Sequence, residues 1–100
     1  MFIAMNRFRV KAGKEEEFET IWRERDSYLS EVSGFKEFHL LRGASGEEET
    51  LFISHSIWES QDAFKAWTKS EAFAKAHSGS RSSRDVILSH PQFEGYEVVL

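Results

Sequence analysis

The period of the hydrophobic pattern changes early in the chain, and this change constrains the fold more than any other feature. The even positions of 2–10 are Phe2, Ala4, Asn6, Phe8 and Val10, and the odd positions are Ile3, Met5, Arg7 and Arg9. Such a split into two faces is typical of a strand. From residue 14 to residue 32, large apolar side chains recur every three or four residues, as in an amphipathic helix. The sequence therefore predicts a strand over 2–10 and one long helix over 14–32.

The rest of the chain also alternates between strand and helix patterns. The other predicted elements are strands over 35–42, 50–58 and 92–100, a helix over 61–69, a shorter helix that ends at His77, and a loop over 78–90. A turn over 43–49 joins two strands into a hairpin, and Ser60 and Ser70 can cap the two later helices. The order of elements is that of an α+β, ferredoxin-like split βαβ fold whose second helix is broken in two.

The uncovered side of such a sheet predicts a second subunit. No break in composition divides the 100 residues, so we expect a single domain over 1–100. A ferredoxin-like sheet carries its helices on one face, and Ile3 and Met5 lie on the other. We therefore expect a homodimer, a dimeric α+β barrel in which a second copy covers this face.

Composition excludes several kinds of partner and site. The net charge of -4 offers no basic face for nucleic acid. Cysteine is absent, so any metal must bind nitrogen or oxygen ligands. The first ten residues lack the pattern of a secretory signal, and no apolar run reaches the ~20 residues that a membrane span needs. We expect a cytoplasmic protein without a membrane or nucleic-acid partner.

Asn6 is a polar residue on the otherwise apolar side of the first strand. A buried carboxamide costs roughly 1 to 3 kcal/mol for each group that lacks a hydrogen bond. The side chain therefore either bonds to a neighbouring backbone group or to water at the rim of the sheet, or donates its NH2 group to a ligand in a pocket. The residues alone leave both interpretations open.

His77 and Trp67 are further candidates for a site, although each type of residue is more often structural in such a position. A histidine at a helix end commonly interacts with the helix dipole, and a tryptophan at helical spacing commonly belongs to the core. His77 follows Phe73 by four residues and shares its face of the predicted helix. A neutral imidazole beside such apolar side chains could bind heme iron, and Arg81 and Arg84 in the next loop could pair with propionates.

Two segments carry a resemblance to a known family: MNRFRVKAGKEEEFE at 5–19 and SIWESQDAFKAWTKSEAFAKAHS at 56–78. They resemble the antibiotic biosynthesis monooxygenase superfamily and, within it, the IsdG-type branch of heme-degrading monooxygenases. The functional residues of that branch are an Asn followed by Arg in the first strand, a Trp in the second helix and a His ten positions later. The corresponding residues here are Asn6 with Arg7, Trp67 and His77.

The resemblance implies that heme is both cofactor and substrate. His77 would be the proximal ligand of the iron, Asn6 a hydrogen-bond donor on the distal side, and Trp67 a bulky contact that distorts the porphyrin. The other candidate heme-binding residues are Trp22, Phe73, Arg81 and Arg84. O2 and electrons from a reductase or a small reductant such as ascorbate would open the ring and release iron and a biliverdin-like linear tetrapyrrole.

Two other functions are compatible with the same residues. A cofactor-free monooxygenase of aromatic polyketides could use Asn6 and Trp67 to hold its substrate and O2. A non-catalytic heme carrier or sensor could hold heme without degrading it. Heme binding separates the first alternative from the heme oxygenase, and turnover in air separates the second.

Overall fold

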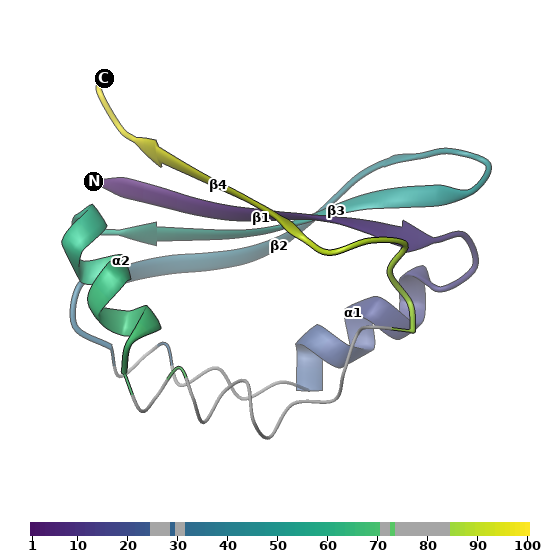
Figure 1. Ribbon diagram of the computed structural model, residues 1–100, viewed down its shortest axis with the longest axis horizontal. Coiled ribbons are helices and arrows are strands. Elements are labelled where there is room, and N and C mark those ends of the chain that lie inside the picture. The colour runs from purple at the N-terminus through teal and green to yellow at the C-terminus, as the bar shows by residue number, and fades with distance from the viewer. Residues whose placement is uncertain (25–28, 30–31, 71–72, 74–84) are drawn as a thin grey trace.

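The computed structural model describes residues 1–24, 29, 32–70, 73 and 85–100. Its elements are, in chain order, β1 (Phe2–Lys11), α1 (Glu15–Glu24), β2 (Phe35–Ser45), β3 (Glu49–Trp58), α2 (Gln61–Thr68) and β4 (Gln92–Glu97). Both helices lie on the same face of the sheet (Figure 1). The predicted α+β, ferredoxin-like fold is confirmed.

The sheet has the strand order β2-β3-β1-β4, and each of its pairings is antiparallel. In the central strand β1, Asn6 lies opposite Ser54 of β3 on one side and opposite Phe93 of β4 on the other. Residues directly opposite each other project from the same face of a sheet. The register therefore decides which side chains surround Asn6.

Two separate hydrophobic clusters fill the space between the sheet and the helices. The α1 cluster consists of Phe8, Val10, Phe18, Ile21, Phe52 and Val86. The α2 cluster consists of Phe2, Ala4, Leu29 and Trp58, with Phe64 and Trp67 among the side chains packed against it. On β1, Ala4 belongs to one cluster and Phe8 to the other. The intervening position on this face is Asn6, so the polar residue marks the boundary between the clusters.

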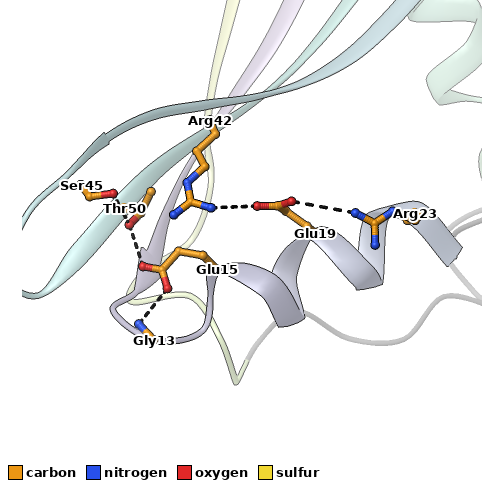
Figure 2. A network of polar contacts seen from close by, with 7 residues as sticks. All are labelled: Gly13, Glu15, Glu19, Arg23, Arg42, Ser45 and Thr50. Atoms are coloured by element: carbon orange, nitrogen blue, oxygen red, sulfur yellow. Dashed lines mark hydrogen bonds and ion pairs between the residues drawn. The ribbon is translucent and has the colours of Figure 1, made fainter.

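A hydrogen-bond network ties the start of α1 to the β2–β3 hairpin (Figure 2). The Glu15 carboxylate accepts hydrogen bonds from the hydroxyl of the buried Thr50 and from the N–H of Gly13, each at 2.8 Å. Its own backbone N–H and the Thr50 hydroxyl are the main causes that hold the pKa of Glu15 below its ordinary value of 4.5. One turn later, Arg42 of β2 donates to Glu19 at 3.1 Å. These contacts fix α1 over the hairpin.

Two strands, β2 and β4, differ in length from the predicted ones by three residues, and the other two by one residue. β2 continues to Ser45, which makes the turn shorter than the predicted 43–49, because Ser45 still pairs with Thr50 across the hairpin. β4 ends at Glu97 instead of Leu100, because Glu97 pairs with Phe2, where β1 begins. Both differences follow from where the partner strand offers hydrogen bonds, which the hydrophobic pattern does not reveal.

The described parts of the helices and of the last loop agree with the prediction except at Val32, which lies in a bend outside any helix. The Ser60 hydroxyl accepts a hydrogen bond from the N–H of Ala63 and caps α2, as predicted. The predicted extension of the first helix to residue 32 falls largely on residues outside the described ones, as does the first half of the predicted loop over 78–90. The described end of this loop forms an isolated bridge between Ile87 and Val10.

The second face of the sheet carries many apolar side chains, and no helix of the described part of the chain covers it (Figure 1). The apolar residues that this face presents include Ile3, Met5, Leu41, Ile53, Ile57 and Tyr96. Leu41 and Tyr96 are exposed in the single chain. We call this surface the open face. Among the described helices, none has the length and apolar character to cross a membrane.

Candidate functional site

A row of residues crosses the sheet at the boundary between the α1 and α2 clusters. From β2 to β4 its members are Leu40, Ser54, Asn6 and Phe93. They project toward the helices, because Asn6 has the same orientation as the buried Ala4 and Phe8. The two inner members are polar and the two outer ones are apolar. We call Asn6 and Ser54 the polar pair.

The Asn6 side chain is half-buried and has no hydrogen-bond partner among the residues that the structure describes. A bond to a neighbouring backbone group, one of the two interpretations of the sequence, is therefore not found in this part of the chain. The NH2 group retains the capacity to donate two hydrogen bonds, and the amide oxygen can accept them. Asn6 is thus available to water or to a ligand on the helix side of the sheet.

Aromatic rings of α2 and β4 form a wall beside Asn6. Trp67 packs on the buried Trp58 with ring centroids 5.4 Å apart and meets Phe73 edge to face at 4.8 Å. Phe64 stacks on Phe93 with centroids 5.6 Å apart and only 6° between the ring planes. Phe93 remains 53% exposed. The structure therefore brings the predicted residues Trp67 and Phe73 together and adds a flat, accessible aromatic surface next to Asn6.

Trp22 lies on the opposite side of the polar pair, in contact with the α1 cluster. Its ring stacks on Phe38 of β2 with centroids 5.7 Å apart and 19° between the planes, and meets Phe8 edge to face at 5.8 Å. A hollow of about 510 Å³ opens here, lined by Glu19, Trp22, Arg23, Phe38, Leu40, Arg42 and Phe52. Trp22 and Trp67 therefore belong to two different walls, with the polar pair between them.

Three of the predicted heme-binding residues, His77, Arg81 and Arg84, lie outside the residues that the structure describes. Their roles stay predictions. Within the described ranges, no group of three or more His, Asp and Glu side chains is arranged to hold a metal ion. His39 and His55 face each other across β2 and β3 on the open face, on the side of the sheet away from Asn6.

Ser54 and Phe93 are residues of this surface that the sequence pattern did not identify. Ser54 lies two positions after the buried Phe52 in β3 and so has an inward orientation. Its position on the inward-facing side of the strand was the signal that the sequence offered, but hydroxyl residues are common in strands. Only the register of β3 and β4 on β1 shows that both residues flank Asn6.

Comparison with known proteins identifies the family. The family model for antibiotic biosynthesis monooxygenase matches residues 1–79. The chain belongs to this family. A heme oxygenase (mycobilin-producing) of Mycobacterium tuberculosis is 37% identical to it over 98 residues, which make up 98% of this chain and 89% of the relative. A heme-degrading monooxygenase of Shouchella clausii is 40% identical over 65 residues, which make up 65% of this chain and 60% of the relative.

Solved structures of other proteins have a similar fold. The structure of the heme degrader MhuD from Mycobacterium tuberculosis, with two hemes in its active site, has a TM-score of 0.77 and 35% identity and covers 100% of this chain and 97% of its own. The cofactor-independent oxygenase SnoaB from Streptomyces nogalater has a TM-score of 0.69 and 18% identity and covers 99% of this chain and 93% of its own. The second likeness concerns the fold alone. The 37% identity to a heme oxygenase, which extends over 98% of this chain, confirms the predicted membership in the heme-degrading branch.

Proposed function

We propose that this protein is a heme-degrading monooxygenase for which heme is both cofactor and substrate. The observation that carries the proposal is the position of Asn6, a half-buried carboxamide without a partner among the described residues, between two aromatic walls. A planar apolar ligand with a polar centre fits such a surface. The heme oxygenase relative that matches nearly the whole chain supports the same assignment.

The residues of the chain fit the three chemical parts of heme. The exposed ring of Phe93, stacked on Phe64, offers a flat surface to the macrocycle. His77 supplies the imidazole that binds the iron, and Arg81 and Arg84 supply positive charge for the propionates. Asn6 lies on the floor of the site, where its NH2 group can face the distal side of the iron.

Each residue has a defined task in the proposed reaction. Bound heme supplies the iron that activates O2 and the meso carbon that is oxidised. Asn6 would donate hydrogen bonds to the bound heme and its ligand, His77 would hold the iron, and Trp67 would contact the porphyrin from α2 and distort it. An external reductase or a small reductant such as ascorbate supplies the electrons, since the sequence has no flavin or nicotinamide motif. The products are iron, water and a biliverdin-like linear tetrapyrrole, and the oxidised meso carbon is accounted for as carbon monoxide or as an aldehyde.

The protein acts as a homodimer in this proposal. The open face presents aliphatic side chains on both central strands and the exposed Tyr96 on β4, and water would otherwise cover them. A second copy of the chain can bury this face by the symmetric contact of two identical sheets, which completes a dimeric α+β barrel. The helix side of each sheet, with the polar pair, stays accessible to heme.

Titration of the apoprotein with hemin tests the proposed function. We expect a Soret band that saturates at one heme per chain and then decays in air when ascorbate is added, with a linear tetrapyrrole detected by mass spectrometry. A stable Soret band under these conditions would identify a heme carrier or sensor. The complete lack of a Soret band would favour a cofactor-free oxygenase. Either result overturns the proposal.

Two substitutions separate binding from turnover. His77→Ala is expected to weaken hemin binding at least tenfold, because the iron loses its protein ligand. Asn6→Ala is expected to keep hemin affinity within about threefold and to slow decay of the Soret band roughly tenfold or more, because a distal donor is removed. His90→Ala removes an exposed histidine and serves as the control. Decay at the wild-type rate in Asn6→Ala contradicts the role given to this residue.

A further inference from the structure

Three hydroxyl residues, Thr50, Ser54 and Ser56, project from the helix side of β3, and they differ in their hydrogen bonds. Thr50 and Ser54 are buried, with 0% and 6% of their surface exposed, and Ser56 is half-buried. Thr50 donates to the Glu15 carboxylate at 2.8 Å and lies 3.0 Å from the Ser45 hydroxyl. Ser56 donates to the carbonyl of Ala4 at 3.2 Å and accepts from the indole N–H of Trp58 at 2.9 Å. Both of these hydroxyls are engaged within the protein.

The Ser54 hydroxyl makes no hydrogen bond with any residue that the structure describes. The Ser54 oxygen is not among the fully buried side-chain atoms that lack a partner, so this hydroxyl reaches the accessible surface and can bind water or a ligand there. Ser54 lies directly opposite Asn6, whose carboxamide also lacks a partner within the described ranges. Two neighbouring polar side chains therefore face the same space on the helix side without binding each other.

We propose that Ser54 is a second hydrogen-bonding residue of the distal surface, which contacts the ligand bound there together with Asn6. The inference rests on the proposed function and adds a residue to it. Ser54 lies between Asn6 and Leu40 in the row, at the boundary of the α1 and α2 clusters. The ligand's apolar ring system meets the aromatic walls, and its polar distal group meets the polar pair.

The two members of the pair have complementary hydrogen-bonding capacities. The Asn6 NH2 group can only donate, whereas a serine hydroxyl donates one hydrogen bond and accepts two others. Ser54 can therefore donate a hydrogen bond to a small anion or accept one from a protonated ligand, whereas Asn6 can accept one only through its amide oxygen. The hydroxyl gives the distal surface a group that can either donate or accept a hydrogen bond.

Azide binding to the ferric hemin complex tests this role without reliance on turnover. Azide accepts hydrogen bonds on the distal side, so loss of one donor weakens its binding by about three- to tenfold. Ser54→Ala removes the hydroxyl without adding volume. Ser54→Thr and Ser54→Val have nearly the same shape and differ in the hydroxyl alone. We expect the Ala and Val variants to bind azide about three- to tenfold more weakly and the Thr variant to stay within about twofold of the wild type.

Ser56→Ala is the matched control, because it removes a hydroxyl from the same face of the same strand that is already bonded within the protein. Its azide affinity should stay within about twofold of the wild type. A normal Soret band with equal azide affinity in Ser54→Ala, Ser54→Val and the wild type overturns the role of Ser54 and leaves the proposed function in place. A wild-type protein that gives no Soret band with hemin overturns both.

Discussion

At the scale of single residues, hydrogen-bond partners separate structural polar groups from functional ones. The alternation of residues 2–10 was sufficient to single out Asn6. The alternation in β3 does not single out Ser54, because Thr50 and Ser56 also lie on its inward-facing side. Only the hydrogen bonds of Thr50 and Ser56 show that these two residues are structural. Sequence patterns report which face a residue lies on, and they do not report what it is bonded to.

The structural role of Ser56 leads to a prediction about stability. Trp58 is fully buried, and its indole N–H donates to the Ser56 hydroxyl at 2.9 Å. In Ser56→Ala this N–H loses its partner, so we expect the free energy of unfolding to fall by about 1 to 3 kcal/mol. Urea unfolding followed by tryptophan fluorescence measures the change. Ser89→Ala, at an exposed serine, should unfold at the wild-type urea concentration. Equal midpoints for the wild type and Ser56→Ala would show that the bond does not contribute.

At the scale of elements, the sequence predicted where helices begin better than where strands end. The start of α1 follows from local chemistry, since Glu15, Glu16 and Glu17 occupy its first turn. The cap of α2 is also local, because the Ser60 hydroxyl and the N–H that it accepts from are three residues apart. The end of β2 at Ser45 depends instead on pairing with Thr50, a contact that forms only once the hairpin exists.

The attachment of α1 to the hairpin predicts a specific loss of stability in acid. The pKa of Glu15 is lower in the folded chain than its ordinary value of 4.5, chiefly because its own backbone N–H and the Thr50 hydroxyl bond to the carboxylate. As the pH falls, the Glu15 carboxylate of the unfolded chain is therefore protonated first. The contribution of Glu15 to the free energy of unfolding is present above about pH 4.5 and is lost as the pH falls through the lower pKa of the folded chain.

Glu15→Gln cannot titrate at this position and provides the test. We expect it to be less stable than the wild type at pH 7 and to approach the wild type as the pH falls to about 3. Urea unfolding over this pH range measures the difference. Glu16→Gln removes the same charge from the same helical turn, where the side chain is exposed. Its loss of stability at pH 7 should be smaller than that of Glu15→Gln. A difference between Glu15→Gln and the wild type that is constant with pH would contradict the role of these hydrogen bonds.

At the scale of the whole molecule, the order of elements was sufficient to predict the sheet, because few topologies accommodate this order with helices on one face. The division of the core into two clusters was not predictable, since it depends on the register that places Ser54 beside Asn6. The site lies at this division. The heme ligand at His77 could be proposed only through the family resemblance, because a histidine at a helix end more often interacts with the helix dipole.

The open face predicts that the protein is a dimer held together by the central strands. Ile57 of β3 lies opposite Ile3 of β1 on this face. A glutamate at position 57 would place a charge in an apolar contact without a partner, and twofold symmetry would introduce it twice. We therefore expect the wild type to sediment at twice the 11.6 kDa mass of the chain and Ile57→Glu to raise the dimer dissociation constant at least about a hundredfold.

Sedimentation velocity across a range of protein concentrations measures both expectations. Gln61→Glu adds the same charge at an exposed position of α2, on the helix side of the sheet, and should leave the dimer intact. Circular dichroism at 222 nm tests whether Ile57→Glu is still folded, because an unfolded variant would also sediment differently. A folded Ile57→Glu variant that remains dimeric would move the interface away from the open face, and a monomeric wild type at tens of micromolar would exclude the dimer. Because the polar pair lies on the other side of the sheet, a folded monomer should still bind hemin.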